Sequence, residues 1–508
     1  MPNEPAGPPS PDQQESPPGL TGGSQGQTMA SPTEDKLPTP TGPTQKASFA
    51  ESILTPAPAE ASEQITSLPS FSKRRFPKLA IFLLIVLFLL GALAFLVSKL
   101  TSSDKGLVGK KGEIVWWGFQ EDESAATSLI EEYQAKNPKV KITYIRQSTQ
   151  DYRERLTNSL AAGTGPDIFE IHNSWPPMFR SDLAVMESSA MSKEEFARTF
   201  YPVIASDLTT EDGVIGMPLF FDAITLYINE DIFASAAKSP PKFWNELKPL
   251  AVGLTPPKDA KGAIIQSGVA LGRTENVDHW PEILGLMMFQ NKVNLAKPTG
   301  KLSEDAVQFF TFFSAEAGVW DEKLPASTIA FAQGKVAMYF GPSRRASEIV
   351  KTNPNLRFKT VPLPQLAKET PGEPDVSYAT YWAEAVWKRS VNKDAAWDFL
   401  KFLTSRDSLE RLNNESKRAK TFERPYPRMD MASLQSDDPI VGSVVALAPY
   451  AKSWYLASDT SDGPTGLNSQ MDALFARALK PGANPKGELE ETAKGVSKLL
   501  SLYSIVVK

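Results

Sequence analysis

Cysteine is absent from this chain, and histidine is nearly absent. None of the 508 residues is cysteine, and only His172 and His279 are histidine. The first absence excludes disulfides, thiolate metal sites and cysteine nucleophiles. The second argues against a histidine-rich zinc site or a histidine-based catalytic triad. We therefore expect no metal, no cofactor and no catalytic residues of these kinds.

Strong net charge and basic blocks are also missing. The formal net charge is −5 at pH 7, which is small for 508 residues, and no basic cluster lies beyond residue 112. Nucleic acid is therefore not an expected partner. Residues 1–70 contain fourteen prolines and almost no aromatic side chain, and all ten tryptophans lie after residue 97. Such a segment buries too little apolar surface to offset its conformational entropy, so we predict a disordered tail over 1–78.

One long apolar run follows this tail. Residues 79–97 contain no charge, and as a helix they would span about 28 Å, close to the ~30 Å hydrocarbon thickness of a bilayer. Its N-terminal flank carries the basic residues Lys73, Arg74, Arg75 and Lys78. This flank favours a single-pass helix in the cell membrane, with the tail in the cytoplasm and the remainder outside. The alternative is a signal peptide cleaved at Ala92-Leu93-Ala94, but the run is long for one and starts late in the chain.

Beyond the run, a linker over 98–111 leads to a region where strands and helices alternate. Apolar periodicity and the stop signals Asn137-Pro138 and Gly163 predict the order strand, helix, strand, helix, strand. The expected elements are strands over 113–119, 140–145, 167–171 and 223–228, and helices over 123–136, 152–162 and 393–404. This order is typical of a parallel α/β sheet. About 400 residues are too many for one such unit, so two α/β lobes are expected within 112–508.

Several segments, in order along residues 112–500, resemble those of a known family. They are Ile114–Gly118, Asn137–Ile142, Asp151-Tyr152, Ala161–Ile168, Gly216–Leu219, Leu226–Phe233, Ala330–Met338 and Ala396–Thr404. Each segment is a weak signal alone. Together they resemble the extracellular solute-binding proteins of ABC-type transporters, of the sugar-binding kind related to maltose-binding protein.

The resemblance implies an α/β, two-lobed periplasmic-binding-protein-like fold, in which each lobe has a central sheet flanked by helices. Mapping by motif assigns 112–222 and 365–430 to the first lobe, and 223–364 and 431–508 to the second. The ligand would bind between the lobes, which close around it by a hinge motion. The resemblance further implies a monomer that is not an enzyme, with ABC permease subunits and a small molecule, expected to be a mono- or oligosaccharide, as partners.

Three departures from the family pattern leave the ligand open. Family members are often anchored by a lipidated cysteine, for which the helix over 79–97 would substitute. Where many relatives have Gly-Gly-Pro-Trp, this chain has Phe340-Gly341-Pro342-Ser343. Where many have a Gly-Gly pair, it has Thr380-Tyr381-Trp382-Ala383. The last two changes fall in the expected cleft, so the identity of the ligand cannot be carried over.

Aromatic side chains near strand ends are the first candidates for ligand contact. Sugars bind to aromatic platforms with a few fixed polar groups, and ligands of parallel sheets lie at the carboxyl ends of strands. Trp116 and Trp117 end the first strand, so one is expected in the core and the other, with Phe119 or Gln120, at the cleft. The expected ligand-binding residues are Trp116, Trp117, Asn173, Trp175, Phe221, Asp222, Trp280, Phe340, Ser343, Tyr381, Trp382 and Trp454.

Structural roles compete with ligand contact at several positions. Trp175 could pack under its loop, and Asp222 could make a hinge hydrogen bond. We expect His279 to be a surface or helix-capping histidine and Arg418 to be a solvated surface residue. Three tryptophans inside regular elements are expected in the core, namely Trp244, Trp387 and Trp397.

These features favour one function over two others. The favoured function is a membrane-anchored receptor that captures a small solute, expected to be a carbohydrate, and delivers it to an ABC-type permease. A glycoside hydrolase would need two carboxylates about 5–9.5 Å apart across a cleft, and no motif pairs two of them. The alternative is a membrane-tethered ligand sensor or surface receptor without a transport role.

Overall fold

The computed structural model describes residues 112–121, 123–418 and 422–505. The predicted tail over 1–78, the apolar run over 79–97 and the linker over 98–111 lie outside these residues. Within the described ranges, no helix is both long enough and apolar enough to cross a bilayer.

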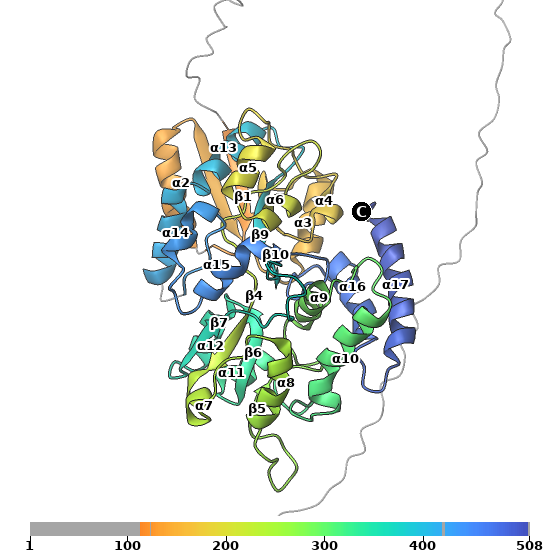
Figure 1. Cartoon of the computed structure of the whole chain (residues 1–508). Coiled ribbons are helices and arrows are strands. Elements are labelled where there is room, and N and C mark those ends of the chain that lie inside the picture. Colours follow the sequence, from red (N-terminus) through yellow and green to blue (C-terminus); the bar gives the residue numbers. More distant parts are fainter. Residues whose placement is uncertain (1–111, 122, 419–421, 506–508) are drawn as a thin grey trace, which may run out of the picture. The chain divides into compact units, whose positions relative to one another are not determined.

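A four-stranded sheet with the order β2-β1-β3-β9 forms the centre of the first lobe, at the top of Figure 1. Its strands are β1 (Gly112–Gly118), β2 (Val140–Arg146), β3 (Ile168–His172) and β9 (Trp382–Val386). As predicted, β1 pairs in parallel with β2 and β3. The helices α2 (Glu123–Lys136) and α3 (Tyr152–Ala162) have the predicted bounds, and each ends at its predicted stop signal. Gly163 ends α3 with a left-handed φ of 78°, which glycine adopts at little steric cost.

The prediction of parallel sheets is wrong for strands that enter from the junction of the lobes. β9 runs antiparallel to β3, with Trp382 opposite His172. The second sheet has the order β5-β6-β4-β7, and β4 is antiparallel to both of its neighbours. Its strands are β4 (Ile224–Asn229), β5 (Ser267–Val269), β6 (Val336–Pro342) and β7 (Phe358–Val361). The chain reaches β9 from β3 only after passing through the second lobe, so no direct strand–helix–strand crossover sets the relative direction of these two strands.

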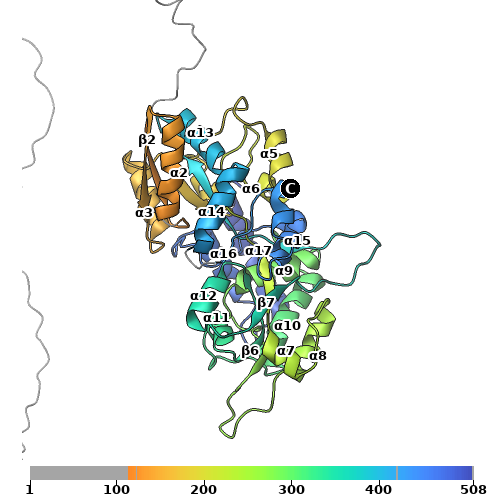
Figure 2. The same ribbon diagram turned by 90° about the vertical axis from the view of Figure 1, so that its left-hand side faces the viewer.

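Helices cover both sheets, as Figures 1 and 2 show. Those near the first sheet are α2, α3, α4 (Pro176–Phe179), α5 (Lys193–Thr199), α6 (Pro202–Asp207), α13 (Lys393–Leu403) and α14 (Arg406–Arg418). Those of the second lobe are α7 (Glu230–Ser235), α8 (Trp244–Gly253), α9 (Trp280–Gln290), α10 (Lys301–Ala315), α11 (Ser327–Ala332), α12 (Arg345–Thr352), α16 (Leu467–Ala476) and α17 (Pro485–Leu502). Between them lie α15 (Gly442–Leu447) and two short 3₁₀ helices, η1 (Met429–Leu434) and η2 (Ala448–Tyr450). The arrangement is two sheet-centred lobes with helical faces.

Three segments of the chain meet side by side at the junction of the lobes. One leads through Ala223 into β4, and Ala223 forms a bridge with Ala379 of the second segment. That second segment contains β8 (Ser377–Tyr378), which pairs in parallel with β10 (Ala451–Lys452) of the third. The lobes are therefore joined by a hinge of three hydrogen-bonded segments.

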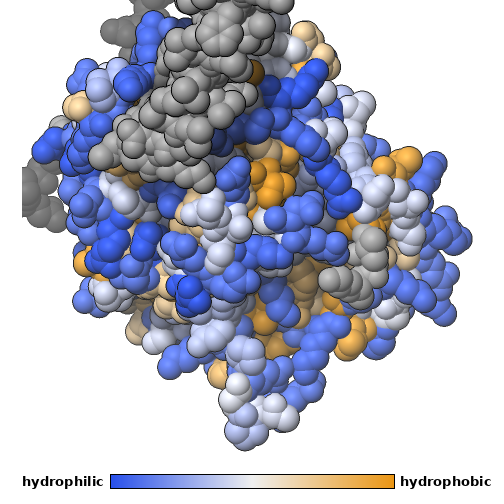
Figure 3. Space-filling view, turned by 90° about the horizontal axis from the view of Figure 1, so that it is seen from above, coloured by the Kyte–Doolittle hydropathy of each residue, from blue (hydrophilic) through white to orange (hydrophobic). Residues whose placement is uncertain are grey.

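Each lobe has its own apolar core. Trp244, Trp387 and Trp397 are buried, as predicted from their positions inside regular elements. Trp320 is also fully buried, and its indole N–H donates to the Asn276 side chain at 2.8 Å. Seen from above in Figure 3, the visible surface is mainly hydrophilic, with apolar residues in small separate groups. The large side chains thus contribute to packing within the lobes.

The lobes also contact each other through the start of α16. The Asn468 side-chain oxygen accepts hydrogen bonds from the Ser174 hydroxyl at 3.0 Å and from the Trp175 indole at 3.2 Å. Arg153 of α3 adds a 2.6 Å hydrogen bond to Thr465. The loop that follows β3 is therefore packed against the second lobe.

Candidate functional site

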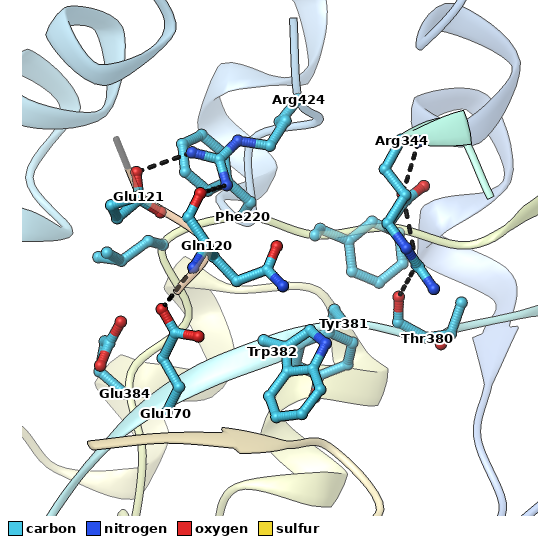
Figure 4. A pocket seen from close by; sticks show the side chains of 13 residues that line it. Gln120, Glu121, Glu170, Phe220, Arg344, Thr380, Tyr381, Trp382, Glu384 and Arg424 are labelled. Atoms are coloured by element: carbon cyan, nitrogen blue, oxygen red, sulfur yellow. Dashed lines mark hydrogen bonds and ion pairs between the residues drawn. The ribbon is translucent and has the colours of Figure 1, made fainter. Parts of the chain in front are cut away.

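A small cavity lies at the hinge, and Figure 4 shows it from close by. Its volume is about 40 Å³. The walls come from the loop after β1, the segment before β4, the turn after β6, the start of β9 and the segment before η1. Lining residues are Gln120, Glu121, Glu170, Leu219, Phe220, Phe221, Asp222, Arg344, Thr380, Tyr381, Trp382, Glu384 and Arg424. Among the lining residues, Arg344 comes from the second lobe, and the others, including the predicted Phe221, Asp222, Tyr381 and Trp382, come from the first.

Trp382 forms an aromatic wall of this cavity. Its ring makes edge-on contacts with Phe119, Trp175 and His172, with centroids 4.6, 5.1 and 5.3 Å away. The indole is only partly buried, so one side remains open to the cavity. Packing on several sides fixes its orientation, which a binding platform requires.

Asp222 ties the hinge to the second lobe. Its Oδ1 accepts hydrogen bonds from the Ser343 amide at 2.9 Å and the Ser343 hydroxyl at 2.8 Å, and its Oδ2 accepts one from the Arg344 amide at 3.0 Å. The Arg344 guanidinium lies 3.8 Å from Oδ2. Burial raises the pKa of Asp222, whereas Arg344 and these hydrogen bonds lower it. The geometry therefore favours the structural hinge role for Asp222 and for its partner Ser343.

Three buried carboxyl groups form the floor of the cavity. Glu170 and Glu384 are directly opposite each other in the β3–β9 pair, and Glu121 makes a 2.7 Å ion pair with Arg424. The Arg424 guanidinium lies 3.3 Å from the centre of the Phe220 ring. Burial raises the pKa of Glu170 to about 8, with a further contribution from Glu121. Burial and the neighbouring Glu170 also raise the pKa of Glu384, so this pair holds a proton at neutral pH.

Other residues predicted to bind ligand are buried in packing positions. Trp116 is fully buried, and its indole donates to Glu384 at 2.9 Å. Trp175 packs beneath its loop, the structural alternative, because Asn468 takes its indole N–H. Phe340 is in the second core, stacked on Trp244 at 5.5 Å. Burial of Trp116, Trp175 and Phe340 argues against direct ligand contact.

Trp117 and Trp280 lie outside the cavity. Trp117 is partly exposed on the opposite face of β1 from Trp116, as strand alternation predicts. Trp280 begins α9 and is partly buried against the core of the second lobe. Neither residue is part of the cavity wall.

Asn173 and Trp454 line a different hollow, a groove of about 1050 Å³ beside α4 and α6. The Asn173 side chain donates to the Asp207 carboxylate at 3.0 Å, as do Ser453 at 2.5 Å and Tyr381 at 3.0 Å. Burial raises the pKa of Asp207 to about 6. The role that the structure gives to Asn173 is to hold this carboxylate.

His279 occupies the N-cap position of α9, one of its two expected places, but its side chain makes no capping hydrogen bond and is buried rather than at the surface. Its buried ring accepts a 2.8 Å hydrogen bond from Arg345 and lies 2.9 Å from the Ser458 hydroxyl. Burial lowers its pKa to about 3, and Arg345 contributes. Polar partners inside the lobe make this burial tolerable. Arg418, at the end of α14, is exposed as predicted.

Sequence reasoning missed most of the charged wall. Glu170 and Glu384 each interrupt a short apolar strand, and a lone acidic residue in such a strand is the signal that identifies them. Arg344 directly follows a predicted residue, Ser343, but its reach into the cavity depends on the turn after β6. No local pattern marks Arg424.

Comparison with known proteins shows to which family this chain belongs. The sequence pattern of the bacterial extracellular solute-binding proteins matches residues 116–409, more than half of the chain. The chain belongs to this family. Relatives of this solute-binding protein include a putative binding protein of Brucella abortus, 23% identical over 283 residues, which are 54% of this chain and 67% of the relative.

Two further relatives have more specific names. The maltotriose-binding protein of Pyrococcus abyssi is 23% identical over 309 residues, or 58% of this chain and 62% of that protein. The diacetylchitobiose-binding protein DasA of Streptomyces coelicolor is 23% identical over 297 residues, or 54% and 65% of the two chains.

Solved structures agree on the fold of this solute-binding protein. An ABC transporter solute-binding protein from Thermotoga lettingae, bound to α-D-tagatose, has a TM-score of 0.60 at 22% identity and covers 77% of this chain and 100% of its own. The sugar-binding protein MalE of Xanthomonas citri has a TM-score of 0.61 at 17% identity, covering 77% and 98%. At these identities the likeness shows the fold, which is the two-lobed α/β periplasmic-binding-protein fold. Members of the family are extracellular proteins that bind solutes, so this solute-binding protein is not an enzyme.

Proposed function

We propose that this protein captures a carbohydrate between its two lobes and delivers it to an ABC-type permease. The observation that carries the proposal is the cavity at the hinge, where Arg344 of the second lobe meets residues of the first lobe. Trp382 offers an aromatic face for the C–H surface of a sugar ring, and the Arg344 guanidinium and the Thr380 hydroxyl offer fixed polar groups for ring hydroxyls. The names of the maltotriose- and diacetylchitobiose-binding relatives support a carbohydrate.

Hinge closure explains how so small a cavity would serve a sugar. A volume of about 40 Å³ is well below the ~300–1000 Å³ of pockets that enclose whole small ligands. A sugar would therefore enter with the lobes apart, and closure would remove water from it. The lobes that move are taken as 112–222 with 365–430 and 223–364 with 431–508.

The same proposal includes a membrane anchor. The apolar helix over 79–97 would keep the tail over 1–78 in the cytoplasm and hold the binding domain outside, attached by the linker over 98–111. Such a tether would take the place of a lipidated cysteine, which this chain does not contain. It would keep the closed, ligand-bound domain near a membrane permease.

Ligand binding is tested on the full-length protein in detergent. All ten tryptophans lie in the proposed binding domain, so intrinsic fluorescence and the melting temperature both report on it. We expect at least one mono- or oligosaccharide to raise the melting temperature, because a ligand that binds only the folded state stabilises it. Shifts with amino acids, polyamines or phosphate esters, but with no sugar, would overturn the carbohydrate assignment.

Two variants locate the site. Trp382→Phe should weaken sugar binding about tenfold, a loss of about 1.4 kcal/mol. Trp387→Phe, at the residue that directly follows β9 and outside the cavity, is the matched control and should leave affinity unchanged. If both variants bind the sugar as tightly as the wild-type protein does, the ligand binds elsewhere.

The anchor and the transport role need separate measurements. We expect the native protein in the membrane fraction with the mass of the uncleaved chain, whereas a soluble product starting near residue 95 would overturn the anchor. Sugar uptake by cells should be lost when the protein is removed. Unchanged uptake with altered gene expression would instead support the sensor or surface-receptor alternative.

A further inference from the structure

The carboxyl groups below Trp382 have more acceptor capacity than the protein uses. Glu170 and Glu384 face each other across the antiparallel β3–β9 pair, so their side chains leave the sheet on the same face. Both line the cavity, together with Glu121 and Arg424 (Figure 4). Arg424 is committed to Glu121 at 2.7 Å.

The hydrogen bonds of Glu170 leave one of its two carboxyl oxygens without a partner within the described ranges. Its Oε1 accepts from the amides of Phe119 and Gln120, each at 3.1 Å. Its Oε2 is buried and has no hydrogen-bond partner among the described residues. In Figure 4 the carboxylate stands at the base of the cavity, beside Trp382. At neutral pH the proton held by the pair relieves the charge of this buried carboxyl group, but Oε2 still has no partner in the part of the chain that the structure describes, and a cationic donor from outside the protein would replace that proton and complete the hydrogen bonding.

The chemistry of the surroundings selects the kind of donor. Glu384 uses its Oε2 to accept from the Trp116 indole at 2.9 Å. The other cation in the cavity wall, Arg344, contacts Asp222 and the Thr380 carbonyl on the hinge side, and no lysine lines the cavity. Because Arg424, the guanidinium nearest the pair, is already paired with Glu121, a positively charged donor would compensate Glu170 and Glu384 better than a neutral one. No group of three acidic or histidine side chains in the described residues is arranged to hold a metal ion.

The volume of the cavity also limits the size of the donor group. A space of about 40 Å³ admits a small polar group but not a sugar ring. A primary ammonium group is compact and has three donors, which can be shared among Glu170, Glu384 and ordered water.

We propose that the cavity beneath Trp382 is a subsite for a protonated primary amine carried by the ligand, with Glu170 and Glu384 as its acceptors. Resting on the proposed carbohydrate function, the inference names the ligand class as amino sugars with a free amine. The sugar ring lies between the lobes against Trp382, and its amine points down to the carboxyl pair. The proton that the pair holds at neutral pH leaves when the ammonium group binds.

Three disaccharides with the same β-1,4-linked skeleton test the proposal by calorimetry at pH 7 on the full-length protein. They are the disaccharides of glucosamine, of N-acetylglucosamine and of glucose, which differ in bearing an amine, an acetamide or a hydroxyl. Maltotriose is included as an unrelated neutral sugar. We expect the amine-bearing disaccharide to bind at least tenfold more tightly than the other three sugars, with proton release on binding.

Isosteric variants identify the acceptors. Glu170→Gln keeps an oxygen for the amides of Phe119 and Gln120 but removes the charge, and should lower the affinity for the amine-bearing disaccharide at least tenfold, which removes its preference over the matched neutral disaccharides. Glu384→Gln is a second, independent variant with the same expected effect. Glu282→Gln changes a buried carboxyl group of the second lobe that does not line the cavity, and should leave the preference for the amine intact. Melting temperatures verify that each variant is folded.

The possible results separate this inference from the proposed function. If any neutral sugar binds as tightly as the amine-bearing disaccharide, or if both glutamine variants keep the preference, the amine subsite is wrong and carbohydrate capture stands. If no carbohydrate binds at all, both proposals fall.

Discussion

Replacing Glu170 by glutamine should change how the stability of the protein depends on pH. Folding raises the pKa of Glu170 from 4.5 to about 8, chiefly through burial. A carboxyl group with a raised pKa contributes stability at low pH, and this stability is lost as pH rises through the folded-state pKa. Full loss corresponds to about 5 kcal/mol, at about 1.4 kcal/mol for each pKa unit. Between pH 6.5 and 8.5, the part lost is about 2 kcal/mol.

This pH window avoids interference from the histidines. Burial lowers the pKa of His172 and of His279 to about 3, so their contribution is present above pH 6.5 and is lost only as pH falls. Glu282, whose pKa burial raises to about 7, titrates in the window but is common to both proteins, so it cancels in the difference.

The assay is urea denaturation at pH 6.5, 7.5 and 8.5, followed by tryptophan fluorescence. The wild-type protein should lose about 2 kcal/mol more than the Glu170→Gln variant between the first pH and the last. Glu131→Gln, which changes an exposed glutamate on α2, is the matched control and should follow the wild type. Parallel pH profiles for the wild type and Glu170→Gln would refute the assignment of a buried, proton-holding pair.

Three further substitutions are measured by urea denaturation at pH 7. Asp222→Asn should cost at least about 2 kcal/mol, because an amide would replace a carboxylate that accepts from the Ser343 amide and hydroxyl; a loss below 1 kcal/mol would contradict this. Asn468→Ala should cost about 1–3 kcal/mol, because it leaves the buried Trp175 indole without an acceptor, and an unchanged midpoint would show that water replaces it. Phe340→Ala should cost about 3–5 kcal/mol, since it opens a cavity against Trp244, and a smaller loss would mean that the core collapses around the gap.

Local signals accounted for the early part of the fold. Asn137-Pro138 and Gly163 are strong helix stops, so α2 and α3 have the predicted bounds. β9 is different, because its partner β3 lies about 200 residues earlier and nothing in its five residues specifies an antiparallel neighbour. Pairing at that distance depends on the tertiary fold, which alternation of apolar residues does not encode.

Some residues of the candidate site were also predictable from local sequence, whereas others depend on the tertiary fold. Tyr381 and Trp382 fall in the segment that the family resemblance places in the cleft, and the cavity includes both. Trp175 also follows a strand, but a side chain from the far end of the sequence, Asn468, takes its only donor. Glu170 lies in a strand whose apolar residues predict burial, and burial alone does not distinguish a carboxyl group of the site from a core position. Position along a strand thus predicted nearness to the site, whereas partners remote in sequence decided which side chains face it.

The place of β9 in the first sheet also has a consequence for the timing of biosynthesis. Until Trp382–Val386 leaves the ribosome, β3 is an edge strand whose outer backbone groups are unpaired. At about 5–20 residues per second, the intervening ~200 residues take roughly 10–40 s to synthesise. During that time the nascent first lobe is incomplete, and an exposed strand edge is open to chaperones or to other chains. We therefore expect the first lobe to become resistant to protease only in nascent chains that extend well past residue 386.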